Sequence, residues 1–439
     1  MGVTFGQTAG MNQSVATVAG SFELLARPGH PDFLDLPWSD PLRSWSGPRL
    51  VDVARGVSRH VVRFIDYDGL VYAMKELPVN LAEREYGLLR ELLERNIPVV
   101  EAVGVVTGRR DEHGEELDSI LITRHLAFSL PYRHLFVGRT VKDLQSRFLD
   151  AMALLLVRLH AEGFFWGDCS LSNTLFRRDA GALTAYLVDA ETGKLQPRMS
   201  NGQREHDLML AGDNVGGELL DLVAAGRVGQ DFDPAAVVED LRLRYDRLWD
   251  EVHHVELVEP GNRMAINRRI RRLNELGFDV GEFSVSTTDD GRQLKVVPRV
   301  VENGHHQRRL HQLTGLDTDE NQARRLLNDI DEHRANLEEE RGRKVPEALA
   351  AYSWLSDVYE PILERIPPEL RGRLAPPELY HQFLEHRWFV SEQAGHDVGT
   401  ELALADYVEN VLRYGTDEAA VLPPPLEDQD EIDGLLTSD

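Results

Sequence analysis

The stretch 49–126 constrains the fold most, because its apolar runs are short and are separated by clear turn signals. It breaks at Gly56 and at Asp68-Gly69, and an Asp-Gly pair between alternating apolar residues is a strong hairpin signal. Three antiparallel strands are therefore expected first. One helix follows, with apolar residues at 81, 88, 89, 92 and 93, and two more strands complete the stretch. The sequence thus predicts a small five-stranded sheet with a single helix.

Beyond this sheet the pattern is mainly helical. A clear helix covers 146–163, two short strands follow in NTLFRR and LTAYLVDA, and helices resume beyond about 205. One interruption, 282–301, alternates around Asp290-Gly291 and predicts a second hairpin. Further helices are expected at 318–340, 346–365 and 376–414, the first of them with Asp317 and Glu320 as its capping pair.

The two ends of the chain differ in amino-acid composition from the part between them. Residues 1–48 are rich in Gly, Pro and Ser, and only Ser21 to Ala26 has a helical pattern. We expect a partly ordered extension that packs Phe33, Trp38 and Trp45 on the following domain. The tail after 423–425 holds six acids and no base between Glu427 and Asp439, so it is expected to be disordered.

Charge and cysteine content narrow the classes of function. The chain has 74 acidic and 48 basic residues, a formal net charge of -26, which disfavours a generic binder of nucleic acid or anionic membranes. A single cysteine, Cys169, excludes a disulfide framework and a cysteine-rich metal site. No apolar run reaches 18 residues, and the first residues lack the pattern of a signal peptide. A cytoplasmic protein without a membrane span is expected.

Four separate signals carry the chemistry. Lys75, one of only five lysines, ends the apolar strand VYAMK, and Glu83 and Glu85 lie in the next helix. WGDCSLSN then contains Asp168 and, five residues later, Asn173. The last signal is Asp189, at the end of the apolar strand in LVDAETG.

Together these residue types suit phosphoryl transfer from Mg-ATP. A lysine ammonium is a compact charge for phosphate oxygens, and a helix carboxylate keeps it ionised and oriented. An acid beside the acceptor hydroxyl supplies a base. An amide and a second acid supply hard oxygen ligands for magnesium. Each signal alone also has a structural explanation: a lysine at a strand rim, a solvated helix glutamate, or the Asp and Asn of an ordinary turn.

On these residues the chain resembles the protein-kinase-like superfamily, and it looks closest to the lipopolysaccharide (Kdo) kinase branch. The segments REYGLLRELLERNIPVVEAVG and LHAEGFFWGDCSLSNTLF carry the similarity, which covers roughly 49–225. The resemblance implies a bilobal kinase fold with ATP between the lobes. The implied fold class is α+β: a bilobal protein-kinase-like fold followed by a mostly helical C-terminal domain with one β-hairpin.

The resemblance also implies roles for single residues. Lys75 would bind ATP, with Glu85 as its partner and Glu83 as the second choice, and Asp168 would be the catalytic base. Asn173 and Asp189 would bind magnesium. The remaining nucleotide contacts would come from the reduced glycine loop and from a hinge at 119–126, through Gly56, Ser58, Thr123 and His125.

Some positions depart from the kinase pattern. Trp166 stands where a histidine usually precedes the catalytic acid, and the residues after Asp189 are Ala-Glu-Thr-Gly. The glycine loop is reduced to Gly56-Val57-Ser58-Arg59, and no long activation segment follows Asp189. Cys169, beside the expected base, is interpreted as a small apolar residue and not as a redox switch.

The second half resembles an uncharacterised actinobacterial family in which a kinase-like region precedes a helical domain of unknown function. Arg263 to Arg272 holds five arginines on an expected helix before the 282–301 hairpin, an order also found in winged-helix modules. We favour a helix whose arginines pair with this acidic protein's own carboxylates. His305, His306 and His311 lack a recognised metal-ligand spacing, so we interpret them as solvated or locally bonded.

The resulting hypothesis is an ATP- and magnesium-dependent phosphotransferase acting on a hydroxyl of a sugar, lipid precursor or small metabolite. The alternative is a nucleotide-binding pseudokinase that acts on a protein partner through its helical domain; a nucleic-acid-binding regulator is disfavoured by the charge. The expected divisions are an N-terminal extension (1–48), a first lobe (49–126), a second lobe (127–225), a helical domain (226–422) and an acidic tail (423–439).

Overall fold

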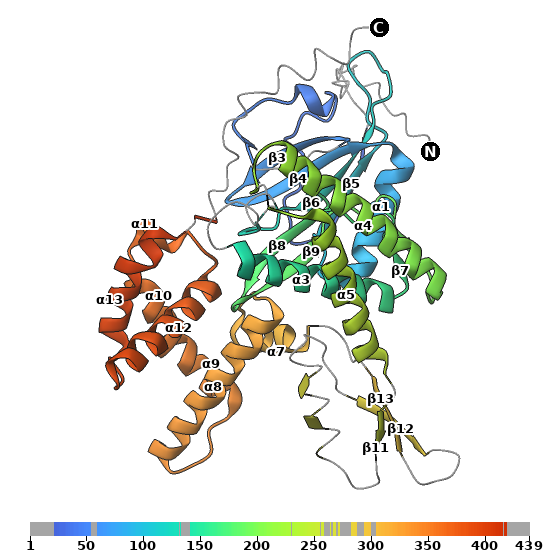
Figure 1. Ribbon diagram of the computed structural model, residues 1–439. Helices are drawn as coiled ribbons and strands as arrows, with labels where there is room; N and C mark the ends of the chain where they lie inside the picture. Colours follow the sequence, from blue (N-terminus) through green and yellow to red (C-terminus); the bar gives the residue numbers. More distant parts are fainter. Residues whose placement is uncertain are drawn as a thin grey trace, which may run out of the picture.

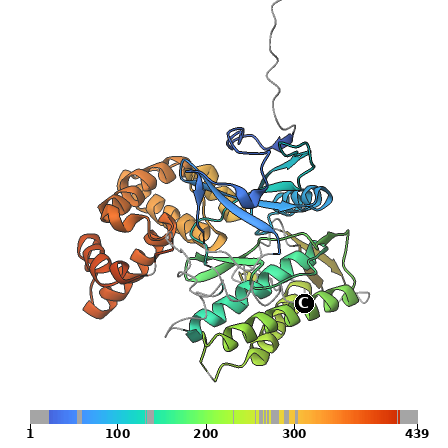
Figure 2. The ribbon, with the colours of Figure 1, turned by 90° about the horizontal axis from the view of Figure 1, so that it is seen from above.

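The computed structural model describes residues 22–53, 59–130, 132, 141–229, 231–254, 256–258, 264, 267–268, 271–272, 282–287, 294–299, 304–415 and 417–418. Figure 1 shows a first lobe built on a sheet, a second lobe of helices and short strands, and a group of C-terminal helices to one side. Seen from above in Figure 2, these C-terminal helices lie beside the two lobes. Among the described residues, no helix combines the length and the apolar character needed to cross a bilayer.

The first lobe is an antiparallel six-stranded sheet with one helix, α1 (Val79–Glu94). The five strands expected from the sequence are confirmed as β2 to β6, and the extension adds a sixth, β1. The Asp68-Gly69 turn joins β3 to β4 with positive φ angles of 55° and 84°, as a type I′ hairpin turn requires. In spatial order the strands are β1 (Glu23–Ala26), β5 (Ala102–Thr107), β6 (Ser119–Arg124), β4 (Leu70–Leu77), β3 (Val61–Tyr67) and β2 (Leu50–Val51).

Strand β1 corrects the helical pattern expected for Ser21 to Ala26. Residues 23–26 are extended and pair with β5, with Leu24 opposite Val106. A stretch this short cannot sustain a helix alone, whereas the edge of β5 offers it a full set of backbone partners. Gly104 permits the close approach, because a Cβ atom there would lie 2.7 Å from the carbonyl oxygen of Leu25.

The extension covers one face of this sheet, as expected from its aromatic residues. Phe33, Trp38 and Trp45 are all buried, and the Phe33 ring lies edge-on to Tyr72 of β4 at 5.1 Å. Arg109 is also fully buried, and it donates to the Trp38 carbonyl at 3.1 Å. Each large aromatic side chain removed from water contributes about 2–3 kcal/mol, so residues 22–48 are an integral part of the first lobe.

The second lobe contains two small two-stranded sheets and several long helices. Helix α5 packs against α3 and α4, and its Val237, Leu241 and Tyr245 belong to their common core. Because α5 lies beyond the boundary expected at 225, we propose that this lobe extends to His253. Its elements are α3 (Val141–Ala161), β7 (Phe164–Phe165), β8 (Thr174–Asp179), β9 (Ala182–Leu187), β10 (Lys194–Leu195), α4 (Asn201–Ala224) and α5 (Pro234–His253).

The two lobes are joined by backbone hydrogen bonds as well as by the chain. After α1, the N–H of Val100 donates to the carbonyl of Leu187 in β9 at 3.0 Å, and the N–H of Leu187 donates to the carbonyl of Pro98 at 3.0 Å. This parallel bridge fixes the end of β9 relative to α1.

The C-terminal region is helical with one small sheet, as expected. The 282–301 hairpin is confirmed as β12 (Glu282–Thr287) and β13 (Leu294–Arg299), and β11 (Glu256–Val258) adds a third strand to it. The capping residue of α8 is Asp319 and not Asp317, since the N–H of Asp319 pairs with the side chain of Gln322. The helices are α7 (His305–Thr314), α8 (Glu320–Arg341), α9 (Glu347–Trp354), α10 (Glu360–Arg365), α11 (Pro368–Arg371), α12 (Pro376–Ala394) and α13 (Thr400–Asn410), with a π-helical turn η2 (Leu355–Tyr359).

Candidate active site

Lys75 lies at the centre of a charged cluster between the lobes. It stands on β4, and its Nζ atom is 2.9 Å from Oε2 of Glu85 on α1 and 2.7 Å from Oδ2 of Asp189. Glu85 is 1% exposed because it lies on the inner face of α1, whereas Glu83 points to solvent. Of the two glutamates considered from the sequence, the structure therefore brings Glu85 to Lys75.

A third carboxylate, which sequence reasoning missed, completes this cluster. Glu191 lies 3.6 Å from Lys75 and 2.8 Å from Nε2 of His60 on the first lobe. Oxygen atoms of Glu85, Asp189 and Glu191 all lie within 4.8 Å of one another. The only sequence signal for Glu191 was its place two residues after Asp189.

Burial and charge shift the pKa values in this cluster. Burial, and after it the nearby charge of Asp189, raise the pKa of Glu85 to about 7, although the Lys75 ammonium opposes both effects. Burial lowers the pKa of Lys75, but the charges of Glu85 and Asp189 outweigh it, so the net shift is upward. Lys75 thus stays charged, and Glu85 is poised near neutral pH.

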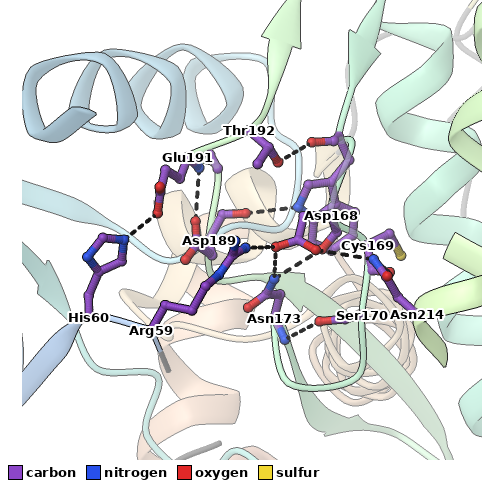
Figure 3. Close-up of polar contacts among 12 residues, drawn as sticks. Arg59, His60, Asp168, Cys169, Ser170, Asn173, Asp189, Glu191, Thr192 and Asn214 are labelled. Carbon is purple, nitrogen blue, oxygen red and sulfur yellow. Dashed lines mark hydrogen bonds and ion pairs between the residues drawn. The ribbon is translucent and has the colours of Figure 1, made fainter. Parts of the chain in front are cut away.

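Asp168 lies on the adjacent loop, and three side chains donate to its carboxylate (Figure 3). Asn173 Nδ2 lies 3.1 Å and Arg59 Nη2 3.0 Å from Oδ2, and Asn214 Nδ2 of α4 lies 3.2 Å from Oδ1. Asn173 also donates to the backbone carbonyl of Asp168 at 3.0 Å. These contacts hold the carboxylate in one orientation, as a base aimed at an acceptor would require.

The loop that carries Asp168 is held from beneath by a buried acid on α4. Asp207 accepts hydrogen bonds from the N–H groups of Trp166 at 2.8 Å and Gly167 at 2.7 Å, and from Nε2 of His160 at 3.0 Å. Glu218, one helix turn beyond Asn214, accepts from the N–H of Leu171 at 2.5 Å. No spacing in the sequence pointed to these residues, because their partners are backbone groups about 40 residues away.

We expect Asp207→Asn to destabilise the protein by about 2 kcal/mol, because an amide hydrogen would then face a buried backbone N–H. Denaturant unfolding of the variant and of the wild type measures this difference. Exposed Asp221 on the same helix provides the matched control, and Asp221→Asn should change stability by less than about 0.5 kcal/mol. Equal stabilities for Asp207→Asn and the wild type would contradict the assigned role of Asp207.

Trp166 connects the Asp168 loop to the segment around Asp189. The indole Nε1 of Trp166 donates to the Asp189 carbonyl at 2.8 Å, and Thr192 Oγ1 donates to the Trp166 carbonyl at 2.7 Å. The tryptophan is fully buried. The residue that departs from the usual kinase pattern is therefore a structural link between the two halves of the candidate site.

Of the four other residues expected to contact the nucleotide, Thr123 and His125 lie within the described residues. Gly56 and Ser58 lie outside the described residues. Thr123 lies in β6, paired with β4 and β5, and the N–H of His125 donates to the Val71 carbonyl at 2.8 Å. That N–H is therefore engaged in the sheet, and the segment joining the lobes begins at His125, after the 119–124 strand. Burial lowers the pKa of the His125 imidazole to about 4, so this ring is neutral at physiological pH.

The structure shows the contacts or burial of three further residues singled out in the sequence. Cys169 is fully buried, and burial raises the pKa of its thiol well above the usual value, which suits a small apolar residue. His306 is locally bonded, with Nδ1 2.6 Å from Glu320. Arg272 pairs with Glu251 at 3.1 Å, as expected for an arginine that meets the protein's own carboxylates; half of 263–272 lies outside the described residues.

The side chains around Asp189 fit a hard divalent cation. Asn173 uses its Nδ2 for Asp168, so its Oδ1 is the atom that it can offer to a cation. Asp189 contributes carboxylate oxygens, and the nearby Glu191 adds more. Magnesium prefers such oxygens and usually takes one or two from the protein. Phosphate groups would also need a fixed cation, and Lys75 supplies one.

Comparisons with known proteins agree with the two-part organisation. Residues 68–210 match the Lipopolysaccharide kinase (Kdo/WaaP) family, and residues 247–412 match a domain of unknown function, DUF4032. No curated protein matches the sequence. The expected resemblance and the expected α+β fold class are confirmed: a two-lobed kinase-like region precedes a mostly helical region with one hairpin.

Two solved structures are similar to the chain. WaaP in complex with acyl carrier protein matches with 16% identity and a TM-score of 0.34, over 58% of this chain and 99% of that chain. An aminoglycoside-3'-phosphotransferase of type VIII matches with 17% identity and a TM-score of 0.32, over 46% of this chain and 88% of that chain.

Proposed function

We propose that this protein is an ATP- and Mg²⁺-dependent phosphotransferase that transfers the γ-phosphate to a hydroxyl group of an acceptor such as a sugar, a lipid precursor or a small metabolite. The observation that carries the proposal is the contact of Lys75 with both Glu85 and Asp189. These three residues come from a strand, a helix and a strand end, and the fold gathers them beside Asp168. The match to the lipopolysaccharide kinase family supports the same chemistry.

In this proposal each residue has a separate task. Lys75, oriented by Glu85, binds phosphate oxygens of ATP, and Asp168 orients the acceptor hydroxyl and accepts its proton. Asn173 and Asp189 hold the magnesium ion, which neutralises charge on the phosphates when bound. Arg59 touches Asp168 from the first lobe, so the acceptor would reach the carboxylate beside a guanidinium.

A thermal-shift titration with ATP, with and without Mg²⁺, tests nucleotide binding. At about a hundred times its dissociation constant a ligand stabilises the folded state by roughly 2.7 kcal/mol, a shift of several degrees. Mg²⁺ should enlarge the shift for the wild type, and Asp189→Asn should remove that gain. The exposed-site variant Asp221→Asn should behave as the wild type. If ATP shifts neither wild type nor variants under any condition, the proposed function is wrong.

The second candidate is a nucleotide-binding pseudokinase that acts on a protein partner through its C-terminal helices. Two observations favour it: the Arg59 contact that occupies Asp168, and the large aromatic side chains of Trp388 and Phe389 on α12, which are 66% and 50% exposed. Phosphate release from ATP, measured with candidate hydroxyl acceptors present, separates the two. Mg-ATP binding without any turnover would favour the pseudokinase.

A further inference from the structure

The β8–β9 hairpin connects the candidate magnesium-binding residues to the C-terminal region. Asn173 directly precedes β8, and Asp189 follows β9 by two residues. At this open end the N–H of Val188 donates to the Asn173 carbonyl at 3.0 Å. The other end of the hairpin, at Ala180-Gly181, points toward the C-terminal helices. A contact that fixes the position of the hairpin therefore affects the positions of Asn173 and Asp189 together.

The tip of the hairpin is held by the first turn of α8. Asp179 is fully buried, and its Oδ1 accepts from the N–H of Gln322 at 2.7 Å. Its Oδ2 accepts from the N–H of Asn321 at 3.1 Å and from the Asn321 side chain at 2.9 Å. The first N–H groups of a helix have no partner within the helix, and its N-terminus favours a negative charge. A carboxylate from the second lobe thus caps a helix of the C-terminal region.

Further buried groups hold the hairpin on both sides of this carboxylate. Asp319 accepts from the hydroxyl of Tyr186 in β9 and lies 3.3 Å from the Arg177 guanidinium of β8. Glu378 of α12 accepts from the N–H of Ala180 at 3.2 Å and from the side chain of Gln322 at 3.0 Å.

Buried acidic side chains make these contacts specific. Asp179, Asp319 and Glu378 are each at most 4% exposed, and a buried polar group that loses its hydrogen-bond partners destabilises the fold. A module that was only tethered to the catalytic lobes would need no such contacts, since interfaces between loosely coupled domains are mostly exposed and polar. Both α8 and α12 therefore contribute to holding the tip of the hairpin.

We infer that the N-terminal end of α8 fixes the β8–β9 hairpin and thereby sets the positions of Asn173 and Asp189 in the cleft. This inference rests on the proposed function and deepens it: the C-terminal region is part of the phosphotransfer apparatus. Asp179 and Gln322 are positioning residues, because neither touches the residues assigned to ATP or to the acceptor.

Asp179→Asn tests this inference, because the new amide would face the N–H donors of α8. We expect the Mg²⁺ concentration that gives half of the maximal ATP-induced thermal shift to rise about tenfold, the effect typical of losing a residue that orients metal ligands. ATP binding without Mg²⁺ should stay unchanged. Hydrogen exchange should become about tenfold faster in peptides 168–175 and 186–191, and remain as in the wild type in α4.

Two further variants make the outcome decisive. Asp329→Asn makes the same chemical change within the C-terminal region, where the donors to Asp329 are Trp354 and Tyr380 and not residues of the hairpin; it should leave the Mg²⁺ dependence unchanged. If Asp179→Asn does not fold, Gln322→Ala leaves Asp179 intact and removes the side-chain contacts of Gln322 to the Arg178 carbonyl, to Glu378 and to the N–H of Asp319; it should give a smaller change in the same direction.

The inference is overturned if either the Mg²⁺ dependence or the exchange at the hairpin ends is the same in the hairpin variants as in the wild type. A wild-type protein that binds no ATP would instead refute the proposed function. The exchange measurement would still decide whether α8 holds the hairpin ends, because it needs no nucleotide.

Discussion

Asp168→Asn should lower the turnover of ATP by about three orders of magnitude, within the range that general-base catalysis contributes. The amide has nearly the shape of the carboxylate but cannot accept a proton from the acceptor hydroxyl. ATP binding should stay nearly unchanged, because Lys75, Glu85 and Asp189 keep their mutual contacts. Steady-state turnover gives the first quantity, and the ATP-induced thermal shift gives the second.

Asp213→Asn is the matched control for this experiment. Asp213 is an exposed residue of α4, next to Asn214, which contacts Asp168. This control should retain wild-type turnover. Equal turnover in Asp168→Asn and the wild type would refute the assignment of Asp168 as the base, and a parallel loss of ATP binding would show that the variant damages the cleft as a whole.

Lys75→Met should destabilise the folded protein by about 3 kcal/mol at pH 8, because it removes the cation from three neighbouring carboxylates and leaves a buried charge without its partner. ATP binding should be lost as well, since the phosphates lose their lysine. Denaturant unfolding at pH 6 and pH 8 measures the change in the free energy of unfolding.

The destabilisation should be smaller at pH 6 than at pH 8. The pKa of Glu85 is raised from 4.5 to about 7 in the folded protein. Stability from such a raised carboxyl pKa is fully present below pH 4.5 and is lost as pH rises through about 7, since the unfolded state releases the proton more readily. Without Lys75 the pKa of Glu85 rises further, so the variant loses more stability on the alkaline side.

The double variant Lys75→Met with Glu85→Gln provides the internal control. It removes the buried charge together with its partner, so most of the stability at pH 8 should return. A loss of equal size at both pH values, or a double variant as unstable as Lys75→Met alone, would show that Glu85 does not carry the effect.

Local signals account for the parts of the fold that the sequence predicted. The turn residues Asp68-Gly69 and the spacing of apolar residues in α1 are signals that lie within a few positions of one another. The five strands and the helix could therefore be predicted from their own segments, without knowing what each packs against. Strand β1 could not, because a run of four residues becomes a strand only through the edge of β5. The same holds for α5, whose place in the second lobe depends on its packing against α3.

In the candidate site, too, some residues could be predicted from the sequence and others could not. Lys75, Glu85, Asp168, Asn173 and Asp189 form a pattern of residue types that can be recognised in order along the chain. Asp207 and Asn214 bind backbone groups or single side chains from 40 or more residues away, and such pairs leave no pattern in one sequence. His125 was expected in a hinge at 119–126; its N–H bonds to Val71 of β4, a pairing with a distant strand that its own segment does not reveal.

The capping of α8 by Asp179 has a consequence for the synthesis of the protein. The two residues that meet there, Asp179 and Asn321, are 142 positions apart. At roughly 5–20 residues per second, a ribosome needs on the order of ten seconds to bridge that gap. In that interval the emerging second lobe carries Asp168, Asn173 and Asp189 before α8 can reach its hairpin. A polypeptide that ends before Asn321 would therefore lack the contacts that hold Asp179.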